Sequence, residues 1–269
     1  MSAHGFTERL LRRDRFLLVT LIGLLFALAG LYTVFGVGMR MSALEMTAMS
    51  GMRDMPGVVR PGDWSAGYVI LVFLMWWVMM VAMMLPSVAP TVLLHSALLR
   101  MGTNASSAPA LSVAFLAGYL VIWAVFSVFA EAAQWGLEAA GLVSPMMMTI
   151  MDTTPGGLVL IVAGIYQFSP LKAACLRHCQ SPAKFLTERR RAGRSGAFAM
   201  GAEHGAYCLG CCWSLMALLF VGGIMNLWWI AGLAAFVAIE KLSRFGPLLG
   251  RVAGVVLIAA GATVVVSGL

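Results

Sequence analysis

Long runs of apolar residues limit the fold of this chain more than any other feature. A helix needs about 20 apolar residues to cross the hydrocarbon core of a bilayer. Candidate spans lie at 16–35, 68–85 (continuing past two prolines towards 99), 111–137, 156–171, 195–221, 224–239 and 248–266. The chain is 61% hydrophobic and 11% charged, which is too little polar surface to cover a soluble enzyme, and it is too apolar for a disordered chain. We predict a single all-α domain over 1–269, a polytopic membrane protein with about seven transmembrane helices.

Basic residues are distributed unevenly between the predicted loops, and this distribution predicts an orientation. With the N-terminus in the cytoplasm and the C-terminus outside, every lysine and arginine except Arg40, Arg53 and Arg60 falls on a cytoplasmic segment. Lysine and arginine accumulate on that side of membrane proteins. The net charge of +7 therefore reflects orientation, and no nucleic-acid partner is predicted. The two sizeable loops are an outer, methionine-rich one at 37–67 and a basic cytoplasmic one at 172–194.

The outer loop carries a regular series of methionines. Met46, Met49, Met52 and Met55 recur at every third residue. Thioethers are soft, uncharged ligands that select Cu(I), so this series predicts the capture of a soft metal outside the membrane. An interfacial amphipathic helix that uses methionine as an adaptable apolar residue is the alternative.

The second span contains a further methionine series. Met75, Met79 and Met83 are four residues apart and share one face of a helix. Methionine also fills gaps in cores and faces lipid, so this stripe by itself does not distinguish a metal path from packing. Its place behind a methionine-rich outer loop favours the metal path.

The fifth span holds the most specific group of potential ligands. His204, Cys208 and Cys212 are spaced four residues apart, and Cys211 follows Cys208 by three. Imidazole and thiols on one stripe inside a bilayer predict a soft-metal site, because ionisable groups at that depth are costly and usually functional. One helix supplies only two or three ligands of such a site. A redox pair formed by Cys208 and Cys211, or thiols that simply pack as small apolar groups, are the alternatives.

Close packing is expected beside this motif. Gly201 and Gly205 form a small-x-x-x-small pair, which lets another helix approach His204 closely. A neighbouring helix could supply a missing ligand, and another membrane subunit or a second copy of the chain stays open as its source.

A second cysteine motif lies at the cytoplasmic end of the fourth span. Cys175 and Cys179 are one helical turn apart, with His178 beside them. Thiols stay reduced in the cytoplasm, so this group could receive or release an ion there. The alternative is an ordinary helix end, which Pro182 would mark.

Several of these segments together resemble a known family. They are residues 75–87, 170–182 and 201–213, with the pairs Met225-Asn226 and Glu240-Lys241. The chain resembles the predicted metal-binding integral membrane proteins, a bacterial family of uncharacterised function. The resemblance implies metal binding within the bacterial inner membrane and names neither the metal nor its use.

Three functional hypotheses follow from these residues. The first is a copper-handling membrane protein that binds or translocates Cu(I) through its methionine, histidine and cysteine ligands, with copper and the lipid bilayer as its partners. The second is a metal-centred membrane redox enzyme or an assembly factor for another metalloenzyme. The third is a structural subunit of a larger membrane complex.

Overall fold

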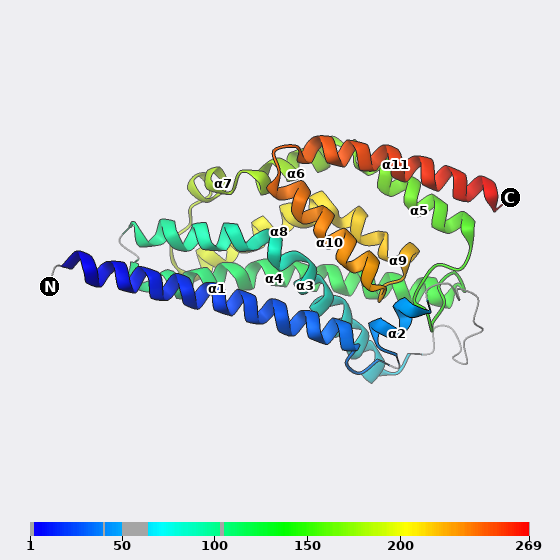
Figure 1. The fold of residues 1–269 in the computed structure, drawn as a ribbon, viewed down its shortest axis with the longest axis horizontal. Helices are drawn as coiled ribbons and strands as arrows, with labels where there is room; N and C mark the ends of the chain where they lie inside the picture. Colours follow the sequence, from blue (N-terminus) through cyan, green and yellow to red (C-terminus); the bar gives the residue numbers. More distant parts are fainter. Residues whose placement is uncertain (1–2, 40, 50–63, 103–104, 269) are drawn as a thin grey trace.

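The computed structural model describes residues 3–39, 41–49, 64–102 and 105–268, which form an elongated bundle of helices (Figure 1). The elements in chain order are α1 (Ala3–Phe35), α2 (Ala43–Ala48), α3 (Ala66–Arg100), the 3-10 turn η1 (Ala105–Ser107), α4 (Ala108–Ala139), α5 (Thr153–Tyr166), α6 (Pro170–Gln180), α7 (Pro182–Glu188), α8 (Gly193–Ala217), α9 (Leu219–Gly222), α10 (Leu227–Leu242) and α11 (Gly246–Ser267). The all-α prediction is confirmed.

Within the described ranges, five helical segments are long and apolar enough to cross a membrane. They are Phe16–Phe35, Ala66–Arg100, Ala105–Ala139, Gly193–Gly222 and Gly246–Ser267. The pair α5 and α6, bent by 64°, makes a sixth if it is taken as one broken span. The chain is therefore a multi-pass membrane protein by helix length and hydropathy, while the side on which each terminus lies stays a prediction.

Seven membrane spans were expected, and the one predicted at 224–239 is not among the candidate spans of the described residues. Asn226 caps α10 by accepting a hydrogen bond from the Trp228 amide, so the helix begins only at Leu227, and its final residue is Leu242. Its 16 residues extend about 24 Å at 1.5 Å per residue. The helix is thus shorter than the ~30 Å hydrocarbon core.

Glycines bring α4 and α8 into backbone contact at the centre of the bundle. A Cβ atom added at Gly118 would collide with the backbone of Phe198, and one added at Gly201 would collide with the backbone of Phe115. The close approach expected beside His204 is therefore made by α4 of the same chain. This contact sets the register that brings α4 side chains to the cysteines of α8.

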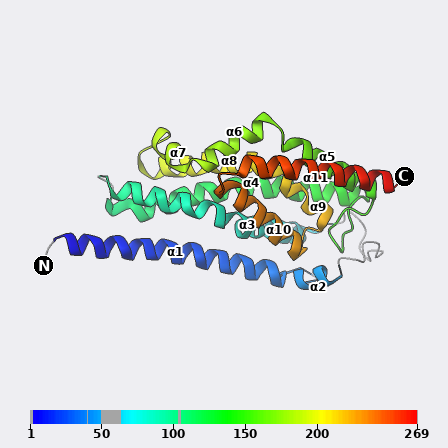
Figure 2. The ribbon, with the colours of Figure 1, turned by 45° about the horizontal axis from the view of Figure 1, so that its top comes forward.

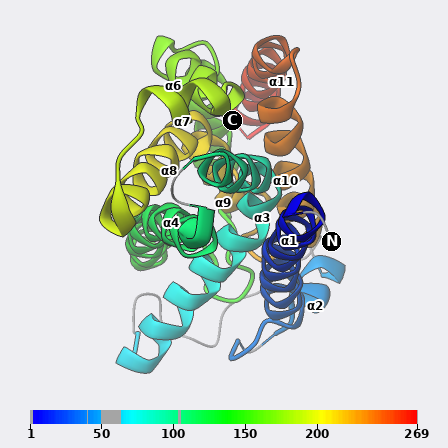
Figure 3. The same ribbon diagram turned by 90° about the vertical axis from the view of Figure 1, so that its left-hand side faces the viewer.

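The remaining helices surround this centre. In Figure 3, which looks along the bundle, α1 lies at the edge beside α3. Figure 2 shows α11 running beside α5, a pairing in which Gly157 of α5 lies against the backbone of Gly261. Apolar side chains such as Phe16 and Leu24 of α1 point outward, with 69% and 54% of their surface exposed. Such surfaces suit contact with lipid and would be costly in water.

Candidate metal centre

Helix α8 places its four predicted ligands inside the bundle. His204, Cys208, Cys211 and Cys212 are each at most 3% exposed, because their spacing keeps them near the face of α8 that packs on other helices. The thiols of Cys211 and Cys212 both donate to the carbonyl oxygen of Cys208, at 3.1 and 3.0 Å. All five cysteines of the chain are free thiols.

A buried lysine lies among these sulfur atoms. The Nζ atom of Lys241 donates to the Sγ atom of Cys208 at 2.8 Å, and it lies 3.8 Å from the Sγ atom of Cys212. The Sδ atom of Met84, on α3, is 3.9 Å from the same nitrogen. Lys241 comes from the last turn of α10 and is 5% exposed. Three helices thus bring two thiols, one thioether and one ammonium group to a single point, which we call the sulfur site (Met84, Cys208 and Cys212).

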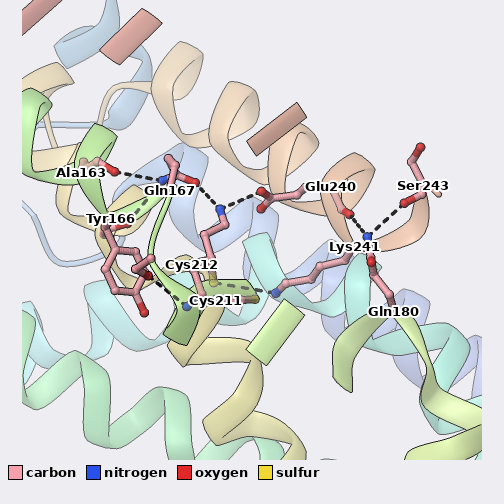
Figure 4. A network of polar contacts seen from close by, with 12 residues as sticks. Ala163, Tyr166, Gln167, Gln180, Cys211, Cys212, Glu240, Lys241 and Ser243 are labelled. Atoms are coloured by element: carbon pink, nitrogen blue, oxygen red, sulfur yellow. Dashed lines mark hydrogen bonds and ion pairs between the residues drawn. The ribbon is translucent and has the colours of Figure 1, made fainter. Parts of the chain in front are cut away.

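The end of α10 is held in place by a second polar network, shown in Figure 4. The ammonium group of Lys172 on α6 lies 2.7 Å from Glu240 Oε1 and also donates to Gln167. Gln180 donates to the carbonyl oxygens of Glu240 and Ser243, at 2.9 and 3.1 Å. These contacts tie α6 to the last turn of α10, and thereby fix the backbone from which Lys241 extends.

Helix α6 also brings the second cysteine motif against α8. The side chains of Cys179 and Cys211 lie close enough to interact with each other. A Cβ atom added at Gly210 of α8 would lie 2.7 Å from the Sγ atom of Cys175. The two cysteine motifs, at 175–179 and 208–212 in the chain, therefore form one thiol layer between α6 and α8.

The two histidines of these motifs have different surroundings. The ring of His178 stacks on Tyr207 with its centroid 4.1 Å away, and its Nδ1 atom contacts the carbonyl oxygen of Ala174. His178 is therefore already engaged and is not brought together with the thiols. His204 packs among the rings of Phe115, Tyr119 and Phe185. Its Nδ1 atom is buried and has no hydrogen-bond partner among the described residues.

The methionine stripe of α3 faces the protein interior. Met75, Met79 and Met83 are each at most 2% exposed, so lipid contact does not explain them. Met84 directly follows Met83, on the neighbouring face of the helix, and reaches the sulfur site. A row of buried thioethers therefore leads along α3 to the cysteines of α8.

The outer methionines are described only in part. Met46 is 5% exposed and packs into the core from α2, and Met49 is half-buried at the end of that helix. Helix α2 begins with a capping box in which Ser42 and Glu45 bond reciprocally, and these hydrogen bonds from Ser42 hold the pKa of the Glu45 carboxyl group below its ordinary value. Met52 and Met55 lie outside the described residues, so a capture site formed by all four stays a prediction.

The predicted ligands do not form a ready-made polydentate site. In the described part of the chain, no group of three or more His, Cys, Asp or Glu side chains is arranged to hold one metal ion. The thiol of Cys208 contacts Lys241, whereas that of Cys211 donates to a backbone carbonyl oxygen and lies beside Cys179. The residues at this point that the sequence did not place among the predicted ligands are Met84, Tyr119 and Lys241. Two of them carried a signal, since Met84 lies on the face next to the methionine stripe and Lys241 is a charge within an apolar segment.

Comparison with known families bears directly on this sulfur-rich interior. Residues 73–264 match the model of the family PpoB2, which is described as a copper chaperone. The chain belongs to the PpoB2 copper chaperone family. No curated protein and no solved structure matches the chain. The match includes the α3 methionine stripe and both cysteine motifs. The family and the membrane-like helices together confirm the expectation of a membrane protein that handles a metal. The description of the family makes copper the metal to consider.

The residues of the sulfur site fit copper as a cargo. Thiols and thioethers are the soft ligands that select Cu(I) over harder ions. The site is buried, and Met84 and Cys212 are each 0% exposed, so a bound ion would be kept from water and from oxidants. Cys208 and Cys212, one turn apart on one helix, could both reach the same ion.

Proposed function

We propose that the protein is a membrane-embedded copper chaperone that holds Cu(I) transiently at the sulfur site and then passes it on. The observation that carries this proposal is the convergence of Met84, Cys208 and Cys212 on one point, at 3.9, 2.8 and 3.8 Å from Lys241 Nζ. Membership of the PpoB2 family supports copper as the cargo. The bacterial inner membrane and a cytoplasmic N-terminus are part of the proposal.

The buried methionines of α3 form the approach to this site. Met75 and Met84 are nine residues apart, which corresponds to about 14 Å along a helix. Thioethers bind Cu(I) without having to lose a proton, and several weak sites in series let an ion move because each can also release it. In this proposal Met79 and Met83 pass the ion stepwise towards Met84.

The thiol layer between α6 and α8 forms the next station. Cys211 lies on the same helix as Cys208 and Cys212, and its side chain contacts Cys179 of α6. An ion held by Cys212 therefore has a second pair of thiols within one helical turn. The proposed order is Met84 with Cys208 and Cys212 first, and Cys211 with Cys179 second.

The contacts of the cysteines favour this proposal over the redox alternative. In a dithiol oxidoreductase one thiolate attacks the substrate disulfide and the second thiolate then attacks the resulting mixed disulfide, so the two sulfur atoms must be able to reach each other. The thiol of Cys208 instead contacts Lys241 and Tyr119, whereas the thiol of Cys211 donates to the carbonyl oxygen of Cys208 and not to its sulfur. Their arrangement suits two adjacent binding positions better than one redox pair.

A Cu(I) titration of the purified protein in detergent, under anaerobic conditions, tests the proposal. The wild-type chain should compete with a chromogenic Cu(I) chelator, and X-ray absorption should report a shell dominated by sulfur. The double variant Met84→Leu/Cys208→Ser should bind Cu(I) about tenfold more weakly or worse, which is the loss that even outer-sphere changes cause at metal sites. Met101→Leu is the matched control, because Met101 is 79% exposed. Equal binding by wild type and the double variant would refute the proposal.

A further inference from the structure

The ammonium group of Lys241 contacts all three sulfur atoms of the proposed copper site. Its Nζ atom is 3.9, 2.8 and 3.8 Å from the sulfur atoms of Met84, Cys208 and Cys212. An ammonium group carries one positive charge and donates hydrogen bonds to lone pairs, and Cu(I) carries one positive charge and accepts the same lone pairs. The lysine therefore makes with these sulfurs the contacts that a monovalent soft cation would make.

No carboxylate competes for this lysine in the described part of the chain. The neighbouring Glu240 is paired with Lys172 at 2.7 Å, and the recorded hydrogen bonds of Lys241 Nζ all go to sulfur. A buried charge requires partners, because removing it from water is costly. The sulfur atoms are those partners, so Lys241 depends on the same atoms as the cargo.

The position of the lysine is built into the fold. Lys172 and Gln180 of α6 hold the last turn of α10 through Glu240 and the Ser243 carbonyl. Tyr119 of α4 contacts the Cys208 thiol from another side, with its hydroxyl 3.0 Å from Sγ. The ammonium group thus has a fixed backbone behind it, while its four-carbon stem gives it freedom to withdraw.

We propose that Lys241 is an internal competitor for the copper site, whose ammonium group fills the sulfur site in the absence of cargo and must withdraw for Cu(I) to bind. This inference rests on the proposed function and adds a mechanism of release to it. A sulfur lone pair cannot serve the lysine and the metal at once, so part of the binding free energy is used to displace the ammonium group. When copper leaves, the same group refills the site. A chaperone gains from this arrangement, because its cargo must be surrendered to an acceptor.

Removal of the charge tests the inference. In Lys241→Gln, chelator competition should show Cu(I) bound about tenfold more tightly than in wild type, since a charge-assisted hydrogen bond no longer has to be broken. Transfer of Cu(I) to excess chelator should be slower by a similar factor. Lys241→Arg retains the charge and should show no gain in affinity. Lys184→Gln, which alters a lysine whose side chain is 73% exposed, is the surface control.

The outcomes separate this inference from the proposed function. If Lys241→Gln gains less than about threefold in affinity while wild type binds Cu(I) through sulfur, the lysine is not a competitor and the copper site stands. If wild type itself binds no Cu(I), both proposals fail. Should Lys241→Gln not fold, the wild-type protein provides the test. A membrane-permeant amine reagent should label Lys241 more strongly after Cu(I) loading, and unchanged labelling would overturn the inference.

Discussion

The hydroxyl group of Tyr119 lies 3.0 Å from the thiol of Cys208, across the interface between α4 and α8. This contact joins the helix pair that forms the centre of the bundle to the proposed copper site. Tyr119 is 0% exposed and Cys208 2%, so neither group can exchange this partner for water. The position of the thiol therefore depends on how the two helices pack.

Loss of the Tyr119 hydroxyl group should weaken the fold measurably. Tyr119→Phe removes one buried hydrogen bond and no apolar contact, so we expect a loss of about 1 kcal/mol and a lower midpoint of thermal unfolding in detergent. Tyr207→Phe is the matched control, because the ring of Tyr207 stacks on His178 and that stacking survives the change. An unaltered midpoint for Tyr119→Phe would mean that the hydroxyl group contributes nothing to stability.

The buried pair of Lys172 and Glu240 should show strong coupling. Lys172→Met leaves the Glu240 carboxylate without its cation, and loss of one partner of a buried pair costs about 3–5 kcal/mol. The double variant Lys172→Met/Glu240→Met removes both charges and should recover a large part of the lost stability. A double-mutant cycle on unfolding in denaturant measures this coupling. If the effects of the two single changes were additive, the two groups would not be interacting.

Two glycines of α4 should respond in opposite directions to the same substitution. Gly118→Ala forces a methyl group into the backbone of α8 and should destabilise the protein or prevent its folding, as judged by yield and thermal midpoint. Gly136 has no heavy atom within 4 Å of an added Cβ. Gly136→Ala should therefore be neutral or stabilising by up to about 1 kcal/mol. Equal tolerance at both positions would argue against the close packing of α4 on α8.

The methionine stripe of α3 should matter for copper more than for stability. Met79→Leu/Met83→Leu retains apolar volume, and such swaps usually cost less than about 1.5 kcal/mol. The loss of two thioethers should slow the loading of the sulfur site severalfold, as followed by stopped-flow mixing with a Cu(I)-chelator complex. Met101→Leu again serves as the control. Unchanged loading by a variant with reduced stability would identify the stripe as packing alone.

Patterns within one helix could be predicted from the sequence, and contacts between helices could not. The shared face of His204, Cys208 and Cys212 follows from 3.6 residues per turn, and the structure buries all three. The contact between Lys241 and Cys208 depends on how far α10 and α8 are shifted along their axes relative to each other. The spacing of residues within one helix carries no information on that shift.

Helix ends were the other source of difference. The length of α10 is set by the cap at Asn226, a local signal that a search for apolar runs overlooks. His178 has a ligand-like position in the sequence, but its ring is turned to Tyr207. The direction of a side chain near a helix end depends on the neighbouring helix, which here is α8.

The bend of 64° between α5 and α6 has a consequence for the centre of the molecule. Ser169 caps α6 at this bend and accepts a hydrogen bond from the Lys172 amide, and the Lys172 side chain that follows is buried. Without the bend α6 would run in another direction, and Lys172 would not lie at its present position beside Glu240. The last turn of α10, which carries Lys241, would then lose one of its contacts. The bend in a peripheral pair of helices therefore also helps to fix the lysine that contacts the sulfur atoms at the core.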